Sequence, residues 1–117
     1  MKAVLVASAL LGLSSAATIV KAGVHYEEWF TEDCAGKPFS WFDLIDGSCS
    51  AIEQFPVKSI KLTPTNPCPA GTSFQVRIST QDSSTGCDDK NPAGIYVASG
   101  SCINVSYWPA TFQAKCI

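Results

Sequence analysis

The fold of this chain is decided by a segment that occurs twice. Residues 34–49 read CAGKPFSWFDLIDGSC, and residues 87–102 read CDDKNPAGIYVASGSC. Both copies begin with cysteine, carry a lysine three positions later and close with Gly-Ser-Cys, so a shift of 53 residues (102 − 49 = 53) superimposes them. The same shift relates Pro56 to Pro109 and places Phe55 opposite Trp108. A register this consistent predicts an internal duplication.

The first residues are typical of a secretory signal peptide. Met1 and Lys2 precede an apolar run over residues 3–13, and small residues follow at positions 14–17. The run is shorter than the roughly 20 residues that cross a bilayer, and no later segment is long enough. We expect removal of residues 1–22, while cleavage after Ala17 also satisfies the small-residue rule. The sequence therefore predicts a secreted, extracellular protein without a membrane span.

Removal of the signal peptide leaves one predicted domain, residues 23–117. Its 95 residues (117 − 22 = 95) bury only a modest core. An even number of cysteines in a short secreted chain indicates a disulfide framework. The cysteines are Cys34, Cys49, Cys68, Cys87, Cys102 and Cys116. Each half, about 23–70 and 71–117, holds an odd number of them, so complete pairing requires at least one bridge between the halves.

Short stretches of alternating polarity predict about seven strands and no helix. They lie at residues 23–30, 39–45, 57–63, 73–79, 95–98, 103–107 and 111–116. The Pro-rich stretch 63–71 is expected to break the ladder, and residues 81–92 are expected to form a polar loop. In the third strand, Lys58, Ile60 and Leu62 are expected to share a face. The predicted class is all-β: a small disulfide-stapled sandwich or barrel built from two diverged repeats of Greek-key or meander type.

Large aromatic side chains are the candidate contact residues. They are Trp29, Trp41, Tyr96 and Trp108, some of which must belong to the core. For Trp29 the sequence favours packing under a loop or an opposite sheet over exposure. The first half carries more aromatics between the shared turns than the second, which makes it the favoured binding half if these rings are exposed.

Charge and motif content argue against several classes of function. The mature chain has 6 Lys and Arg against 10 Asp and Glu, a net charge of −4, so neither nucleic acid nor an anionic membrane is an expected partner. Nucleophilic catalysis is not expected, because no nucleophile motif accompanies the lone His25. Glycoside hydrolysis is not expected either, because Glu27 and Glu28 point to opposite faces of one strand and do not converge on a cleft. No Cys-x-x-Cys motif is present, so neither a metal site nor a cofactor is expected.

A single acceptor for N-linked glycosylation is present in the triplet Asn104-Val105-Ser106. In a strand over residues 103–107, Asn104 would lie on the face opposite to that of Ile103 and Tyr107. We therefore predict Asn104 as a surface glycosylation site.

Two β units, each entered by an aromatic strand and containing turn glycines, resemble the duplicated Greek keys of the βγ-crystallin superfamily. The residues that carry the resemblance are the segment 26–30 (YEEWF), Gly36, Gly47 and the strand 57–62. The resemblance implies a rigid secreted binder or toxin. The calcium signature of that superfamily is not met, because Pro92 and Ala93 stand where it requires hydroxyl side chains. The chain also resembles the small cysteine-rich proteins, including effectors, that fungi and oomycetes secrete.

The sequence thus predicts a non-enzymatic interaction protein of effector, toxin or inhibitor type that binds an extracellular protein. The alternative is a module that binds a cell-wall glycan through exposed aromatic rings.

Overall fold

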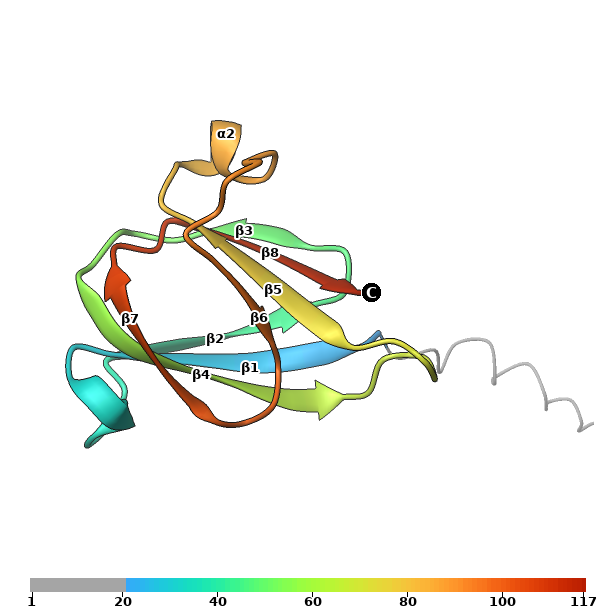
Figure 1. Cartoon of the computed structure of the whole chain (residues 1–117), viewed down its shortest axis with the longest axis horizontal. Helices are drawn as coiled ribbons and strands as arrows, with labels where there is room; N and C mark the ends of the chain where they lie inside the picture. The colour runs from blue at the N-terminus through green and yellow to red at the C-terminus, as the bar shows by residue number, and fades with distance from the viewer. Residues whose placement is uncertain (1–20) are drawn as a thin grey trace, which may run out of the picture.

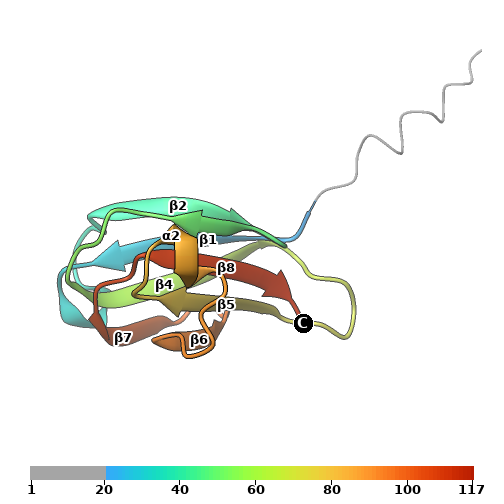
Figure 2. The ribbon, with the colours of Figure 1, turned by 90° about the horizontal axis from the view of Figure 1, so that it is seen from above.

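The computed structural model describes residues 21–117, without the side chains at positions 83 and 84. The predicted signal peptide lies almost entirely outside the described residues. In the described part of the chain, the prediction of an all-β protein is confirmed: two four-stranded antiparallel sheets face each other as a sandwich. Figures 1 and 2 show the two layers from two directions. No helix in this part is long and apolar enough to cross a membrane.

Eight strands and two short helical turns make up the domain. The strands are β1 (Gly23–Trp29), β2 (Ser40–Ile45), β3 (Cys49–Ala51), β4 (Val57–Asn66), β5 (Phe74–Ser79), β6 (Gly94–Val97), β7 (Cys102–Tyr107) and β8 (Thr111–Cys116). A 3-10 turn, η1 (Glu32–Cys34), follows β1, and a four-residue helix, α2 (Ser83–Gly86), lies in the loop after β5. In Figure 1, α2 projects from the top of the sandwich.

The two sheets have corresponding strand orders. One sheet runs β2-β1-β4-β7 and the other runs β6-β5-β8-β3, so adding four to each strand number converts the first three strands of one sheet into those of the other. The fourth strand of each sheet comes from the other half of the chain. Each half therefore places its first, second and fourth strands as in a Greek key and lends its third strand to the opposite sheet.

Alternating side chains from both sheets fill the space between the layers. On β1, Val24 and Tyr26 point inward, and on β5 the inward residues are Phe74, Val76 and Ile78. The remaining large core side chains are Leu44, Val57, Ile60, Leu62 and Phe112. Removal of this apolar surface from water is the main force that holds one sheet against the other.

All six cysteines form disulfides, and every bridge joins the first half to the second. The pairs are Cys34–Cys102, Cys49–Cys87 and Cys68–Cys116. The expectation of at least one bridge between the halves is therefore confirmed. The shift of 53 residues converts Cys34 into Cys87 and Cys49 into Cys102, so the first two bridges occupy corresponding places. Three disulfides in so small a domain are typical of extracellular proteins.

The structure corrects three expectations about local structure. Strand β4 continues to Asn66 and includes Pro64, which pairs with Val24. The ladder tolerates this proline because β7 pairs with β4 only as far as Lys61, so the segment beyond is an edge that needs no second hydrogen bond. The short strand β3 and the helix α2 were not predicted, because three or four residues are too few to show a period.

Candidate binding surfaces

The four candidate aromatics do not meet in one place. Trp29 is buried and Tyr96 is half-buried, whereas Trp41 and Trp108 are 62% and 54% exposed. Trp41 lies on β2 and Trp108 follows β7, and these strands are the opposite edges of one sheet. The described part of the chain therefore presents two separate surfaces that carry an exposed tryptophan.

Trp29 packs beneath the loop that contains η1. Its indole Nε1 donates a 3.0 Å hydrogen bond to the carbonyl oxygen of Gly36, and Nζ of Lys61 lies 5.8 Å from its ring centroid. The loop is fixed on the sheet by the bridge from Cys34 to Cys102 and by the hydroxyl of Ser59, which accepts a hydrogen bond from the amide of Cys34. The expectation that Trp29 lies under a loop is thus confirmed, and its ring offers no exposed platform.

The side chain of Tyr96 fills part of the space between the sheets. Its hydroxyl lies 2.7 Å from that of Tyr107, which links β6 to β7 across the layers. Burial raises the pKa of Tyr107, and the hydrogen bond with Tyr96 raises this pKa further. The hydroxyl of Tyr107 therefore stays protonated at physiological pH. Tyr96, joined to it by this hydrogen bond, acts as part of the interior.

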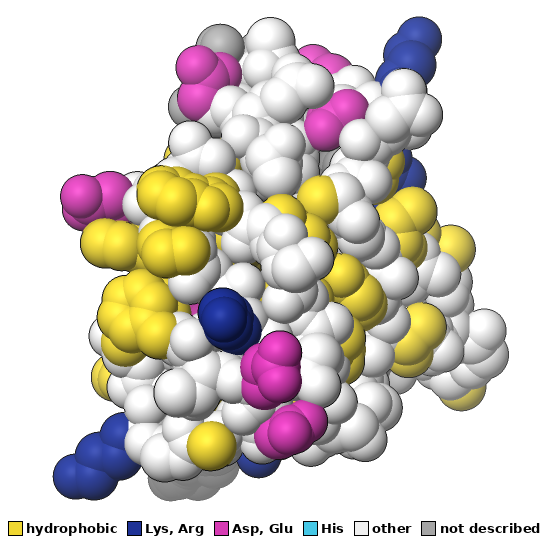
Figure 3. Space-filling model, turned by 60° about the vertical axis from the view of Figure 1, so that its left-hand side comes forward, with side chains coloured by type: hydrophobic (Ala, Val, Ile, Leu, Met, Phe, Trp, Pro, Cys, Tyr) yellow, Lys and Arg dark blue, Asp and Glu magenta, His cyan; other side chains and the backbone are white. Residues whose placement is uncertain are grey.

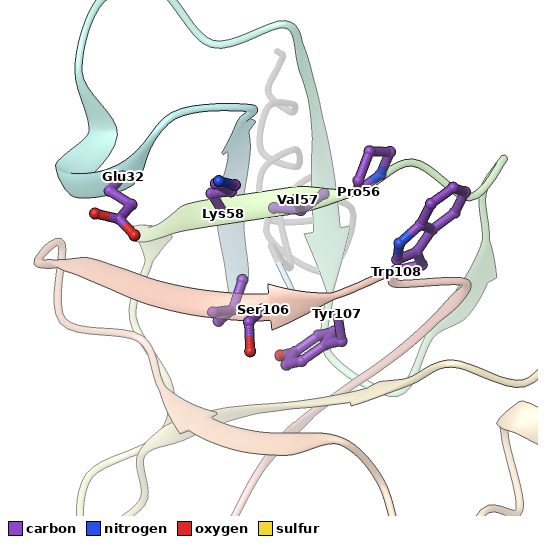
Figure 4. A pocket seen from close by; sticks show the side chains of 8 residues that line it. Glu32, Pro56, Val57, Lys58, Ser106, Tyr107 and Trp108 are labelled. Carbon is purple, nitrogen blue, oxygen red and sulfur yellow. The ribbon is translucent and has the colours of Figure 1, made fainter.

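Trp108 lies at one end of an open groove of about 300 Å³, here called the Trp108 groove. Its walls are the segments 56–58 and 105–108, and Glu32 of η1 lies at the end opposite to Trp108 and Pro56 (Figure 4). The side chain of Gln54 fixes the backbone there, because its Nε2 donates hydrogen bonds to the carbonyl oxygens of Trp108 and Thr80.

A β-bulge between β4 and β7 shapes this groove. Val57 pairs with Tyr107 and Ser59 with Asn104, so one residue of β4 faces two residues of β7. Bulges re-aim side chains and are frequent beside functional sites. The expectation that Lys58 shares a face with Ile60 and Leu62 is wrong. At the bulge, Lys58 is exposed in the groove, whereas Ile60 and Leu62 are buried.

A cluster of phenylalanine rings at the surface, here called the Phe30 cluster, consists of the exposed Phe30 and the half-buried Phe39 and Phe55. The first two rings are parallel with centroids 3.7 Å apart, and Phe55 meets both edge-on. Phe30 is 47% exposed, and Phe55 immediately precedes Pro56 of the groove. On the face of the molecule in Figure 3, hydrophobic side chains gather in a patch with charged side chains beside it.

Trp41 belongs to the outer face of the sheet formed by β2, β1 and β4, and this region is here called the Trp41 face. Two rows of side chains cross β2, β1 and β4 in register: Trp41, Glu27 and Lys61 form one row, and Asp43, His25 and Thr63 form the next. Nδ1 of His25 lies 2.8 Å from Oδ1 of Asp43, and the His25 ring lies 5.2 Å from the Trp41 ring, centroid to centroid.

A buried carboxyl group lies in the core between the sheets. The side chain of Glu28 is almost fully enclosed, and its Oε2 accepts a 2.6 Å hydrogen bond from the hydroxyl of Tyr26. Burial raises the pKa of Glu28 more than this hydrogen bond lowers it. Burial and the nearby carboxylate also raise the pKa of Tyr26. Since the pair is enclosed by the core, it is part of the scaffold.

The predicted glycosylation site Asn104 is exposed on β7. Its side-chain Nδ2 donates to Oδ1 of Asp33, and its Oδ1 accepts from the backbone amide of Asp33. Glycosylation there remains a prediction. Among the described residues, no group of three or more His, Cys, Asp or Glu could hold a metal ion.

Several residues of the two surfaces were not predicted from the sequence as contact residues. The groove residues Glu32, Pro56 and Ser106 were not among the candidate contact residues. The sequence held one usable signal, the correspondence of Phe55-Pro56 with Trp108-Pro109, because both dipeptides adjoin the groove. The bulge that brings the remaining groove residues together depends on pairing between distant strands, so no local pattern in the sequence predicts it. Comparison with protein-family models, curated proteins and solved structures found no match for this chain.

Proposed function

We propose that this is a secreted, non-enzymatic protein that binds an extracellular protein partner through the Trp108 groove and the adjoining Phe30 cluster. The observation that carries the proposal is the exposure of Trp108 and Phe30, at 54% and 47%, beside a groove whose largely apolar lining also carries Glu32, Lys58 and Ser106. Protein interfaces combine an aromatic centre with a polar rim, and tryptophan is among the residues whose truncation costs most binding energy.

The polar groups of the groove suit specific recognition. Glu32 and Lys58 form no ion pair with another described residue, and Ser106 adds a hydroxyl group between them and Tyr107. A partner that buries an apolar side chain against Trp108 can therefore pair with either charge at the far end. Because the walls belong to a disulfide-linked sandwich, little conformational entropy is lost when the partner binds.

The scaffold supports assignment to small secreted binders of effector, toxin or inhibitor type. Three disulfides fix the sandwich, and the corresponding strand orders of the two sheets support an origin by duplication of a Greek-key unit, as the resemblance to βγ-crystallin-like proteins implies. A rigid scaffold with one aromatic surface needs no cofactor or catalytic group to act as an inhibitor or effector.

The test is capture of extracellular proteins by the mature, oxidised chain, followed by measurement of affinity for each purified candidate. Trp108→Ala and Phe30→Ser are the test variants, and Trp41→Ala is the matched control because it removes an equally exposed indole elsewhere. We expect Trp108→Ala to weaken binding about 30-fold, the effect of a hot-spot residue, with Trp41→Ala unchanged. A partner that binds all three variants as well as the wild type would contradict the proposal.

A further inference from the structure

We infer that the Trp41 face is a second binding site, independent of the Trp108 groove, and that its ligand is an uncharged, hydroxyl-rich polysaccharide chain. The site consists of one stacking ring and the hydrogen-bonding side chains of the two rows that cross β2, β1 and β4. Its central members are Trp41, Glu27 and Lys61 in one row and Asp43 with His25 in the other.

The indole ring of Trp41 is both accessible and held in place. It is 62% exposed, and its N–H has no hydrogen-bond partner among the described residues. The ring of His25 packs against it, and Asp43 holds His25 through a 2.8 Å hydrogen bond. An aromatic face is electron-rich and attracts the C–H groups on the apolar side of a sugar ring. Trp41 therefore offers a braced platform on which such a ring can stack.

The neighbours of Trp41 supply both hydrogen-bond donors and acceptors. Glu27 lies directly between Trp41 and Lys61, so an acceptor and a donor follow the platform across about 10 Å, the width of three adjacent strands. Lys61 is itself steadied by its position over the ring of Trp29. Every sugar hydroxyl both donates and accepts, so a row of this composition matches a polyol chain.

The charges on this face favour an uncharged ligand over a nucleic acid or a protein. Two carboxylates, Glu27 and Asp43, alternate with the basic side chains Lys61 and His25 across the strands. The carboxylates repel the phosphates of a nucleic acid. A protein partner would need a continuous apolar centre, whereas Asp43 separates Trp41 from the next exposed apolar residue on β2, Ile45.

The opposite sheet lacks such a platform. At the outer surface of β5 and β8, the side chains of Gln75, Arg77, Gln113 and Lys115 line a shallow hollow without an aromatic ring. The two sheets thus share a strand order but differ in outer chemistry. The platform belongs to the first half, so a glycan site would lie on one side of the sandwich only.

The test uses the full mature chain, labelled with ¹⁵N and titrated with soluble chitin and β-glucan hexasaccharides. The three indole N–H signals are assigned with single Trp→Phe variants. We expect the Trp41 signal to move with increasing ligand while the signals of Trp29 and Trp108 stay in place. Trp41→Ala should weaken binding about tenfold or more, and Glu27→Gln and Lys61→Met should each weaken it by a smaller factor.

Trp108→Ala is the matched control, because it removes an equally exposed indole from the other surface and should leave glycan affinity unchanged. Absence of a shift with both oligosaccharides would overturn the inference, and so would equal losses from Trp41→Ala and Trp108→Ala. A failed glycan titration leaves the protein-binding proposal intact, because that proposal rests on Trp108 and Phe30 and is measured with a protein partner.

Discussion

The hydroxyl of Tyr26 donates a 2.6 Å hydrogen bond to Oε2 of Glu28 two residues along the same strand, inside the core. The alternation of β1 puts both side chains between the sheets, so Tyr26 supplies part of what water would otherwise give the carboxylate. The core therefore contains an acidic group, the carboxyl of Glu28, whose ionisation is disfavoured by burial.

Tyr26→Phe should destabilise the protein by about 1–3 kcal/mol, because it removes a donor from a buried carboxylate and leaves the rest of the ring in place. Urea-induced unfolding followed by circular dichroism measures the change. Glu28→Gln should restore most of the loss in the Tyr26→Phe background, since a neutral amide has less need of a donor. If Tyr26→Phe costs nothing at neutral pH, Glu28 must be solvated in the folded state.

The ionisation of Glu28 should make stability depend on pH. Its pKa in the folded state is raised above the ordinary 4.5, so the folded protein binds this proton more tightly than the unfolded chain does. Its contribution is fully present below about pH 4.5 and is lost as the pH rises through the raised pKa. The wild type should therefore lose stability relative to Glu28→Gln over that window, and Glu28→Gln should be at least as stable at neutral pH. Melting temperatures of both proteins from about pH 4 to about pH 8 test this, and parallel curves would contradict it.

Removal of the Cys34–Cys102 bridge, with both residues replaced by Ala, should cost about 2–4 kcal/mol. It should also loosen the loop over Trp29 and increase acrylamide quenching of tryptophan fluorescence, best read in a Trp41→Phe and Trp108→Phe background. The matched control is removal of Cys49–Cys87, the bridge that the shift of 53 residues relates to Cys34–Cys102 and that does not touch this loop. Equal quenching in both variants would show that the loop is held by its hydrogen bonds to Ser59 and Asn104 instead.

The buried and exposed tryptophans should respond differently to truncation. Trp29→Ala should destabilise the protein by about 3–5 kcal/mol, because the ring is 4% exposed and its indole N–H is hydrogen-bonded. Trp41→Ala and Trp108→Ala should each change stability by about 0.5 kcal/mol or less, since both rings are more than half exposed. Thermal unfolding of the three variants measures this. A large loss from Trp108→Ala would indicate that its ring supports the fold and would weaken its assignment to a binding surface.

Much of the architecture could be predicted from local patterns. The alternation over Phe74, Val76 and Ile78 reports which side of a strand meets the core, and that preference is a property of the strand itself. Cysteine parity required a bridge between the halves, because each half holds an odd number. The repeated Gly-Ser-Cys segment predicts two related units, but it does not predict how their strands combine.

Tertiary structure alone decided the pairing of distant segments and, with it, the surfaces. The exchange of β3 and β7, the bulge that turns Lys58 outward and the rows that set Trp41 beside Glu27 and Lys61 all depend on contacts between strands far apart in the chain. Trp29 and Trp41 have similar sequence surroundings, both in aromatic strands near acidic residues. One is buried and the other exposed because the disulfide-tethered η1 loop covers only one end of the sheet, and no local pattern records which ring a distant loop will cover.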